Sequence, residues 1–495
     1  MPPRPHPVDA RLRWPLFDVA ATRRIETLAL AGVAPHTLMQ RAGLSVARLA
    51  LAIAPHARTI WVAAGPGNNG GDGLEAAAQL QRMGKTPVVT WLGDAATASS
   101  DTAAAWQRAR DAGVVFATTP PPAPDLCIDA LLGIGATRAP AGRMVDWINH
   151  MTASGTPVLS IDLPTGLDAD TGHGAQPHVQ AHHTLSLLTL KPGLFTAMGR
   201  DAAGRVWFDD LQVRAEDAPY AALAAPCATV GGRPGRQARP HASHKGSYGD
   251  VAVVGGAPGM AGAALLAASA ALHYGAGRVY LAALDPSLSA AALSGQPELM
   301  LRAPGDIDLG HCTVVCGCGG GDAVRAEMPR VLAGAARLVL DADALNALAG
   351  DTQLQQQLRH RALRGRPTIL TPHPLEAARL LATDSRVVQQ DRLSAARQLA
   401  RDYDCTVLLK GSGTVIASPG QLPHLNPTGN ARLATAGTGD VLAGALGAAL
   451  AFGLAPHAAA CEVAWQHGLC ADTWPCGSPL VAGELARCLQ PPGCG

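Results

Sequence analysis

The sequence predicts an α/β protein built from two three-layer domains. Its 495 residues are enough for two or three domains that each bury a full core. In both halves, short aliphatic or β-branched runs alternate with helical patterns, which is typical of a parallel sheet covered on both faces. A stretch dominated by Ala, Pro, Gly and Arg separates the halves. We therefore expect domains at residues 1–213 and 241–495, joined by a linker at 214–240.

In the first half, the expected strands are short and mostly apolar, and helical patterns lie between several of them. The strands are predicted at 59–64, 86–92, 126–130, 158–161 and 184–190, and the helices at 74–83 and 144–152. Because strand and helix alternate in this order, we expect parallel strands whose carboxyl ends meet at one edge of the sheet.

The second half shows the same alternation. Strands are predicted at 250–254, 313–316, 337–340, 368–370, 406–409 and 413–416, with helices at 262–274 and 439–454. Aromatic residues make up only 4% of the chain, so the cores must be filled mainly by Leu, Val, Ala and Ile.

Composition excludes several classes of partner. The formal net charge is +1 and no long basic run occurs, which argues against nucleic acid as a partner. No apolar run is long enough for a spanning helix, so we expect no membrane and a cytoplasmic location. The 11 cysteines favour reduced thiols, and Cys312, Cys316 and Cys318 are expected to be buried rather than metal-bound. We also expect a homo-oligomer.

The first half contains a glycine-rich turn, Gly65 to Gly70, that formally matches G-x-G-x-x-G, and Asp94 lies where a ribose-binding acid would be expected. A dinucleotide-dependent dehydrogenase is therefore one interpretation. We reject it because Asp72 falls where the helix N-terminus would have to accept a pyrophosphate, and a carboxylate there repels phosphate. The turn fits a polar ligand, with or without a cation.

Two more acids follow predicted strands of this half. Asp129 closes one strand and Asp162 closes the next. Each of them alone could simply cap the turn or helix that follows. Because ligands of open parallel sheets bind at the carboxyl ends of strands, polar groups at three such ends favour a single site.

The second half lacks a G-x-x-x-x-G-K-[ST] motif, which excludes a Walker-type phosphate loop. Instead, Gly437 and Gly439 precede an apolar helix, where free backbone N–H groups can hold a phosphoryl group. Asp440 follows directly and is placed to accept a proton from an attacking hydroxyl. The alternative is that Asp440 only caps the helix.

Three further strand ends of this half carry polar residues. Lys410 begins a glycine-rich turn that suits nucleotide phosphates or ribose, although a plain β-turn is the alternative. His373 stands between two prolines, which give it a fixed direction, although it could be a helix cap. Asp341 and Asp343 follow another strand.

Taken together, the first-half motifs GNNGGDG, DALLGIG, IDLPTGLDADTG, LKPGL and LMQRAG resemble the NAD(P)H-hydrate epimerase family over residues 15–212. The resemblance implies a Rossmann-like fold, hydrated NADH or NADPH as substrate and a bound K+ ion. It implies Asp162 as the acid/base at the epimerised carbon and K+ ligands at Asn69, Asp129 and Thr165. Two residues depart mildly from the family pattern, Ile134 in place of Thr and Thr165 in place of Ser. The implied substrate contacts are Asn68, Asn69, Gly70, Gly71, Asp72, Gly133, Ile134, Gly135, Ala136, Thr137, Arg138 and Ala139.

The second-half motifs HKGSYG, GGAPGMAGAALLAA, LDADALN, TPHPLE, KGSGT and NPTGNARLATAGTGDVLAG resemble the ADP-dependent NAD(P)H-hydrate dehydratase family over residues 243–455. The resemblance implies a ribokinase-like fold, ADP as co-substrate and Mg²⁺. Ala436 replaces a usual Gly, and Cys318 and Gly320 alter a loop that usually reads GPGLG. The implied substrate contacts are Ala263, Gly319, Gly321, His373 and Asp440, and the implied nucleotide contacts are Lys410, Gly411, Ser412, Gly413, Thr414 and Gly439.

The two resemblances together imply a cofactor-repair enzyme. One half interconverts the R and S forms of hydrated NAD(P)H, and the other dehydrates the S form with ADP, giving AMP and phosphate. The alternative from another class is a small-molecule kinase of the ribokinase class with a non-catalytic N-terminal binding domain.

Overall fold

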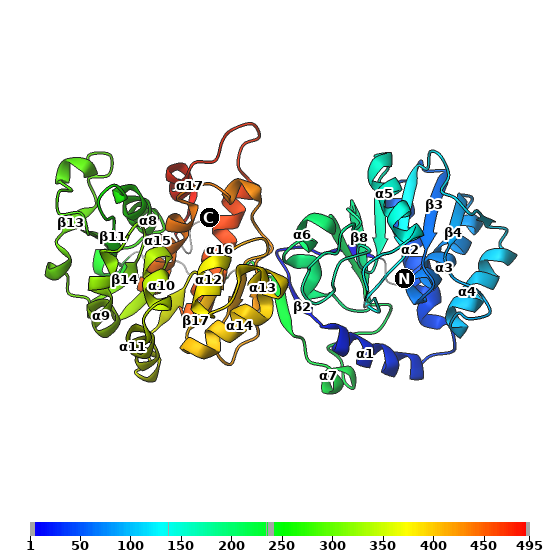
Figure 1. The fold of residues 1–495 in the computed structure, drawn as a ribbon, viewed down its shortest axis with the longest axis horizontal. Helices are drawn as coiled ribbons and strands as arrows, with labels where there is room; N and C mark the ends of the chain where they lie inside the picture. The colour runs from blue at the N-terminus through cyan, green and yellow to red at the C-terminus, as the bar shows by residue number, and fades with distance from the viewer. Residues whose placement is uncertain (1–4, 137, 234, 236–241, 492–495) are drawn as a thin grey trace. The chain divides into compact units, whose positions relative to one another are not determined.

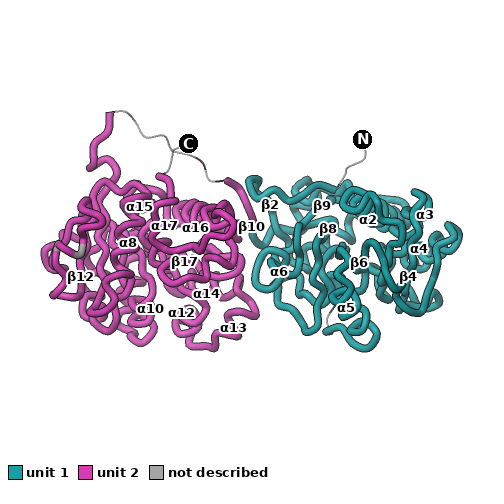
Figure 2. Tube along the Cα trace, turned by 90° about the horizontal axis from the view of Figure 1, so that it is seen from above, with its two compact units in different colours: residues 1–229 teal, residues 230–495 magenta. Residues whose placement is uncertain are grey.

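The computed structural model describes residues 5–136, 138–233, 235 and 242–491, which form two compact α/β units (Figures 1 and 2). Unit 1 spans Met1–Thr229 and unit 2 spans Val230–Gly495, so the expected α/β class is confirmed. The division falls within segment 214–240, which is less featureless than its composition indicates. Helix α7 (Tyr220–Leu223) and strand β10 (Ala228–Gly231) form there, since β-branched Thr229 and Val230 favour a strand. Residues 234 and 236–240 of the segment lie outside the described residues.

Unit 1 contains a sheet with strand order β1-β9-β8-β7-β6-β3-β4-β5. All neighbouring pairs are parallel except β1 and β9. The chain runs outward from β3 through β4 to β5 and then returns to β6 on the other side of β3, which makes a topological switch point between β3 and β6. The strands are β1 (His6–Pro7), β3 (Thr59–Ala64), β4 (Thr86–Trp91), β5 (Val115–Phe116), β6 (Leu126–Ala130), β7 (Val158–Ile161), β8 (His183–Leu187) and β9 (Arg205–Asp209), with β2 (Arg13–Leu16) outside this sheet.

The helices of unit 1 cover this sheet and leave one main apolar core between strands and helices (Figure 1). They are α1 (Val19–Ala31), α2 (Thr37–Ile53), α3 (Asn68–Arg82), α4 (Ser100–Asp111), α5 (Arg143–Ser154), the 3₁₀ helix η1 (Pro192–Phe195) and α6 (Gly199–Ala202). Buried Trp61 and Trp147 meet edge to face in a second, smaller cluster, with ring centroids 6.4 Å apart.

Two elements of unit 1 differ from the sequence expectation in ways that shape the site. The strand expected at 184–190 ends at Leu187, because Leu188 adopts a left-handed backbone with φ of +65° that turns the chain. Helix α3 begins at Asn68 rather than at the expected residue 74. The sequence prediction missed its first turn because the Asn- and Gly-rich segment that forms this turn has poor helix propensity by itself.

Unit 2 contains a larger sheet whose strands follow the order β13-β12-β11-β14-β15-β16-β17-β18-β19. Neighbours from β13 to β17 are parallel, and β18 pairs antiparallel with β17 and β19. A second switch point lies between β11 and β14. The strands are β11 (Asp250–Gly255), β12 (Arg278–Ala283), β13 (Met300–Arg302), β14 (Cys312–Cys316), β15 (Arg337–Leu340), β16 (Thr368–Leu370), β17 (Thr406–Leu409), β18 (Val415–Ala417) and β19 (His424–Leu425).

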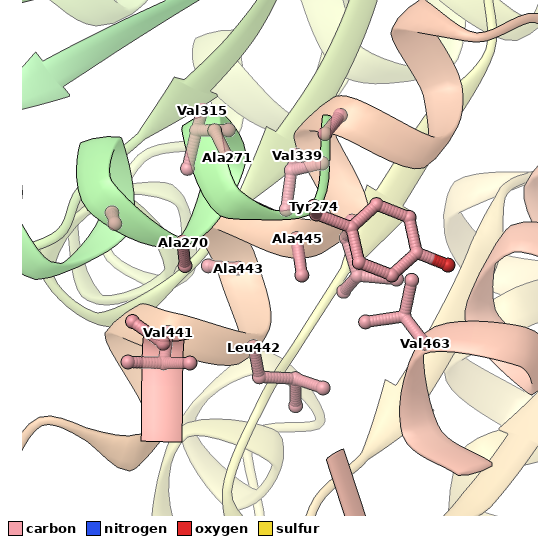
Figure 3. Packing of buried hydrophobic residues seen from close by; sticks show 14 of the residues in the cluster. Ala270, Ala271, Tyr274, Val315, Val339, Val441, Leu442, Ala443, Ala445 and Val463 are labelled. Atoms are coloured by element: carbon pink, nitrogen blue, oxygen red, sulfur yellow. The ribbon is translucent and has the colours of Figure 1, made fainter. Parts of the chain in front are cut away.

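Small residues allow close helix packing in the core of unit 2. A Cβ at Gly444 of α15 would lie 1.9 Å from the carbonyl oxygen of Ala267 in α8, so only glycine permits this approach. Figure 3 shows Ala270 of α8 and Tyr274, which caps the C-terminus of that helix, in the same apolar cluster as Val441 of α15. The helices are η2 (Lys245–Tyr248), α8 (Ala261–His273), η3 (Ala290–Leu293), η4 (Pro304–Asp306), α9 (Val324–Gly334), α10 (Ala342–Ala349), α11 (Thr352–Leu363), α12 (Pro374–Leu380), α13 (Ser385–Gln390), α14 (Arg392–Tyr403), η5 (Ala431–Leu433), α15 (Thr438–Ala451), α16 (Pro456–Asp472) and α17 (Ala482–Cys488).

Within the described residues, no helix combines the length and the apolar character that crossing a bilayer requires. Cys312 and Cys316 are buried thiols of β14, and neither forms a disulfide, as expected for this pair. Cys318 is also a buried thiol, but it lies in a polar cluster described below.

Candidate active sites

A cavity of about 450 Å³ opens at the switch point of unit 1. Polar residues from four elements share its wall: Glu26 of α1, Asp72 of α3, Asp101 of α4 and Asp162 at the end of β7. The sequence-predicted residues that line it are Asn68, Asn69, Asp72, Gly133, Ile134, Gly135, Ala136 and Asp162. Such a position is where open α/β sheets bind ligands.

The first turn of α3 is held tightly against the sheet and α2. A Cβ at Gly70 would lie 2.0 Å from the carbonyl oxygen of Gly65, and one at Gly71 would lie 2.5 Å from Met39 Cε. Packing therefore requires glycine at position 70, where a Cβ would meet backbone, whereas a Cβ at position 71 would displace the end of the Met39 side chain and the Thr102 hydroxyl. Neither Gly70 nor Gly71 lines the cavity, and their close packing fixes where Asn69 and Asp72 lie.

Asp162 is the acceptor of a buried ion pair. Its backbone is left-handed, with φ of +66°, a conformation that Asp tolerates better than most residues. Lys191 Nζ donates to Asp162 Oδ1 and, at 2.7 Å, to the Leu187 carbonyl. Asp162 is 8% exposed and Lys191 1%, so both charges lie almost entirely out of water. Lys191 was not among the residues predicted from the sequence, although the LKPGL motif contains it.

Asp72 and Glu26 are acidic groups in the same cavity. Burial raises the pKa of Asp72 well above its usual value, and the negative charges of Asp162, Glu26, Asp101 and Glu75 raise it further. Burial likewise raises the pKa of Glu26, and Asp162 adds to that shift. The cavity therefore holds carboxyl groups that favour the protonated form next to a carboxylate that is paired with an ammonium group.

Asp129 is fully buried beneath the cavity and accepts several hydrogen bonds from neutral donors. The hydroxyl and the backbone N–H of Thr165 donate to it at 2.6 and 2.9 Å, the Ser160 hydroxyl at 2.8 Å and the Leu131 N–H at 3.3 Å. Burial raises the pKa of Asp129, while these hydrogen bonds oppose the shift. Nearby, Asn69 Nδ2 is buried without a hydrogen-bond partner.

Some sequence-predicted residues of unit 1 lie outside the cavity wall. Arg138 and Ala139 are exposed beyond the rim, and Thr137 lies outside the described residues. Asp94, the candidate ribose-binding acid of the rejected dehydrogenase interpretation, accepts a hydrogen bond from the Ala96 N–H at 2.9 Å and does not line the cavity.

In unit 2, Lys410 follows β17 and lies among three carboxyl groups: one directly after β15, one in α12 and one in α15. Its Nζ donates to Asp341 Oδ1 at 2.7 Å and lies 4.0 Å from Glu376 Oε2. Burial works to lower the pKa of Lys410, but the charges of Asp341 and Glu376 outweigh it and the pKa is raised. Burial raises the pKa of Glu376 to about 7. The third carboxyl group, Asp440, completes the cluster.

Asp440 lies in the first turn of α15, whose N-cap, Gly437, has a left-handed φ of +88°. The N–H groups of a first helical turn lack intrahelical partners and can bind an anion. Burial, followed by the charge of Asp341, raises the pKa of Asp440 to about 6. A Cβ at Gly439 would lie 3.5 Å from Lys410 Nζ, so this ammonium group faces the same turn.

Cys318 joins the cluster from the loop after β14. Its sulfur and one carboxylate oxygen each from Asp341 and Asp440 all lie within 4.8 Å of one another. The thiol lies 4.0 Å from Asp341 Oδ2 and also forms a hydrogen bond with Asp440. The expectation that Cys318 is a buried thiol is confirmed, and two carboxylates lie beside it, Asp341 through the pairing of β14 with β15 and Asp440 from α15.

Two histidines have clear structural roles. His373 caps α12, and its Nδ1 accepts from the N–H groups of Leu375 and Glu376 at 3.1 and 3.2 Å. The alternative given in the sequence analysis, that His373 caps a helix, therefore matches its geometry. His467 Nε2 donates to the Thr438 carbonyl at 2.9 Å, and burial lowers its pKa to about 4, so it stays neutral and anchors the start of α15.

The remaining predicted residues of unit 2 surround this cluster. A Cβ at Gly319 would lie 2.9 Å from Ala263 Cβ, which places the two side by side. The Gly321 N–H donates to Asp343 Oδ2 at 2.8 Å. Residues 410–414 form the turn between β17 and β18, where Gly411 has a φ of +134° and Gly413 one of +64°. The expected strand 413–416 begins at Val415 because this turn needs the left-handed glycines.

Family models match both halves of the chain. The family described as YjeF-related protein N-terminus matches residues 35–193, and that described as NAD(P)H-hydrate dehydratase matches residues 251–486. The ADP-dependent (S)-NAD(P)H-hydrate dehydratase of Neisseria meningitidis is 43% identical and covers 52% of this chain and 87% of its own length. A solved structure of the ADP/ATP-dependent NAD(P)H-hydrate dehydratase of Bacillus subtilis is 30% identical, covering 52% of this chain and 92% of its own, with a TM-score of 0.45.

Other relatives match along nearly the whole chain. The bifunctional NAD(P)H-hydrate repair enzyme of Escherichia coli is 33% identical and covers 93% of this chain and 89% of its own length. That of Gloeobacter violaceus is 36% identical and covers 96% of each chain. The resemblance carried by the sequence motifs is therefore confirmed, and the chain belongs to the family of bifunctional NAD(P)H-hydrate repair enzymes.

Proposed function

We propose that this protein repairs hydrated nicotinamide cofactors with two activities in one chain. Unit 1 interconverts the R and S forms of hydrated NADH and NADPH, and unit 2 dehydrates the S form with ADP, giving AMP and phosphate. The observation that carries the proposal is the similarity, along nearly the whole chain, to relatives named for this repair. An epimerase joined to a dehydratase that accepts only one epimer allows both epimers to be repaired.

In unit 1, we assign the acid/base role at the epimerised carbon to Asp162, which faces the cavity. A positioned acid/base group typically contributes ~10²–10⁴-fold to a rate. The start of α3 and the loop 133–139 would hold the hydrated cofactor, since Asn68, Asn69 and Gly133 line the same wall. Amide side chains and backbone groups suit a nicotinamide carboxamide and its ring hydroxyl.

A K+ ion fits beside this cavity. Asp129 is a buried carboxylate whose hydrogen-bond partners are all neutral, so a cation would supply the missing positive charge. The hydroxyl of Thr165 adds one oxygen ligand. The side-chain amide of Asn69, whose Nδ2 has no hydrogen-bond partner, adds another when it is turned so that its oxygen points to the ion. Asn69, Asp129 and Thr165 would hold the ion, which would fix the loop that follows β6.

In unit 2, Asp440 would take the proton of the ring hydroxyl as that oxygen attacks the β-phosphoryl group of ADP. The bond from that phosphorus to AMP breaks. Phosphate then leaves the ring carbon, the neighbouring ring carbon releases a proton to water, and the electron pair of that C–H bond forms the double bond. The first turn of α15 would stabilise the charge on the transferring phosphoryl group, and one such donor is typically worth ~10²–10³-fold. Lys410, the turn that follows it and Gly439 would contact the nucleotide, and Ala263, Gly319, Gly321 and His373 the hydrated cofactor.

Mg²⁺ fits the same cluster because carboxyl groups outnumber the single ammonium group of Lys410. Mg²⁺ takes oxygen ligands and is usually shared between one or two carboxylates and substrate phosphates. Glu376 and Asp341 would hold it together with the nucleotide. The ion would neutralise phosphate charge during the transfer.

The test is an assay with hydrated NADH, ADP and Mg²⁺ that follows the recovered absorbance of the reduced cofactor. We expect the S form to be consumed at once and the R form to follow through epimerisation. Replacing ADP with ATP measures the nucleotide preference. The proposal fails when no cofactor is recovered with either nucleotide, and phosphorylation of an added vitamin or sugar alcohol would then support the kinase alternative. Sedimentation in solution tests the homo-oligomer, which stays a prediction, as does the cytoplasmic location.

A further inference from the structure

The cavity of unit 1 contains one acidic side chain that has no polar partner. Asp72 lines the cavity together with Glu26 of α1, and within the described residues its carboxyl group has neither a hydrogen bond nor an ion pair. Asp162, by contrast, receives the ammonium group of Lys191 and the Leu187 N–H at 3.3 Å. Two carboxyl groups of one cavity therefore have opposite surroundings.

Packing keeps Asp72 in this position. Gly70 and Gly71 press the first turn of α3 against Gly65 and Met39, so the helix cannot rotate Asp72 away from the cavity. Around it lie Glu26 of α1, Asp101 of α4 and Glu75 of α3, of which Glu75 is paired with Arg108 and Asp101 with His36. The ammonium group of Lys191 pairs with Asp162, and the charges of Lys191 and Arg23 lower the pKa of Glu26.

These surroundings favour one protonation state of Asp72 over the other. Burial and four negative charges raise the pKa of Asp72 well above its usual value, which favours the neutral acid. Pairs of carboxyl groups with opposite environments commonly divide the acid and base roles of an enzyme between them.

We propose that Asp72 is a catalytic residue of the epimerase, the proton donor that works opposite the Asp162–Lys191 pair. This inference rests on the proposed function of unit 1 and assigns that function a second reacting group. It goes beyond a binding role for the start of α3, because it requires the Asp72 proton to move.

The chemistry balances without any oxidant or reductant. Adding water to a ring enamine places the hydroxyl on the carbon bonded to nitrogen. Asp72 donates its proton to that hydroxyl, the carbon–oxygen bond breaks, and water leaves as the ring nitrogen lone pair forms a carbon–nitrogen double bond. Water then adds to the opposite face, Asp162 takes one of its protons, and the electron pair returns to nitrogen. Proton exchange through cavity water restores both carboxyl groups, and the reverse direction exchanges their roles.

The first measurement follows the substrate oxygen during epimerisation in water labelled with heavy oxygen, with the full chain and no ADP. We expect the label to enter the ring hydroxyl in step with inversion. Inversion without label would overturn the proposal, because the carbon–oxygen bond would then have stayed intact.

The second measurement compares Asp72→Asn with wild type. Asn keeps the shape but carries no transferable proton, so we expect kcat for epimerisation to fall ~10²–10⁴-fold with a smaller change in KM. The residual activity should lose the decline at high pH that deprotonation of Asp72 causes in wild type, a readout that a merely structural role would not move. Asp72→Glu should restore part of kcat. A kcat of Asp72→Asn within about threefold of wild type would overturn the proposal.

Dehydration of the S form with ADP, measured in the same preparations, is the matched control, because it uses residues of unit 2 only. Its preservation shows that the variant chain is folded and active. The two hypotheses also fail differently. A wild-type chain that does not interconvert the epimers would refute the proposed function, whereas an active wild type with an equally active Asp72→Asn refutes this inference alone.

Discussion

The two units place an aspartate–lysine pair at the carboxyl ends of their strands, but they use the lysine differently. In unit 1, Lys191 pairs with Asp162, the proposed acid/base itself. In unit 2, Lys410 pairs with Asp341, and the thiol of Cys318 forms a weak hydrogen bond with Asp440 beside it. The buried lysine therefore pairs with the proposed reacting carboxylate in unit 1 and with the carboxylate beside it in unit 2.

The difference has a chemical consequence. Lys410 pairs with Asp341 and not with Asp440. Burial and the charge of Asp341 therefore outweigh the effect of this lysine and raise the pKa of Asp440 to about 6. A base with this pKa is ionised at neutral pH and still accepts protons readily. In unit 1, burial and neighbouring negative charges raise the pKa of Asp72 well above its usual value, and Asp72 has no ammonium partner among the described residues. Four predictions test this contrast, from the largest effect to the smallest.

Removing each proposed base should abolish one activity and spare the other. We expect Asp440→Asn to lower kcat for dehydration by ~10²–10⁴-fold, because Asn cannot accept the hydroxyl proton. Asp162→Asn should lower kcat for epimerisation by a similar factor. Each variant is assayed for both activities, so that the untouched unit serves as the control. Loss of both activities in one variant would contradict independent sites.

Removing the buried lysine of unit 1 should destabilise that unit. Lys191→Met leaves Asp162 as a buried charge without its partner, which typically costs ~3–5 kcal/mol of unfolding free energy. Urea unfolding followed by intrinsic tryptophan fluorescence measures the change. We expect the double variant Lys191→Met/Asp162→Asn to recover much of the loss, because no charge is then stranded. A double variant as unstable as the single one would indicate lost packing rather than electrostatics.

Dehydration should decline as the pH falls through about 6, the pKa of Asp440. The sign follows from the proposed role, because the base must be deprotonated and the raised pKa moves its protonation to higher pH than for an ordinary carboxyl group. Well below that value, kcat/KM should fall about tenfold for each pH unit. The measurement is kcat/KM for the S form between weakly acidic and neutral pH. A rate that stays level well below the Asp440 pKa would show that another group is the base.

Removing the thiol should shift that pH profile slightly. Cys318 hydrogen-bonds to the Asp440 carboxylate and thereby lowers its pKa, so Cys318→Ala should move the decline to higher pH. Because a weak hydrogen bond is worth under about 1 kcal/mol, the pKa should rise by less than about 0.7 unit, so kcat/KM should fall less than about twofold at neutral pH and up to about fivefold on the acid side of the profile. Cys318→Ser keeps a donor and should lie closer to wild type. Identical profiles for wild type and Cys318→Ala would show that the thiol only fills space.

The structural framework was largely readable from local sequence. Strands β3, β6, β7, β15, β16 and β17 were predicted with the bounds that the structure has. Apolar runs indicate buried strands directly, and an acid that follows such a run must lie at the carboxyl end of that strand. Strands β9 and β12 were missed, although each has an apolar run after its first arginine, as β15 does.

By itself, the sequence determined the α/β class of both units and the aspartates at their strand ends, because these follow from local apolar periodicity and from the motifs. Only the tertiary structure decided which aspartate pairs with which lysine. Asp162 and Lys191 are 29 residues apart, and Asp341 and Lys410 are 69 apart. Such pairs form only when the crossover connections of a parallel sheet bring distant strand ends together, and no local pattern records that meeting.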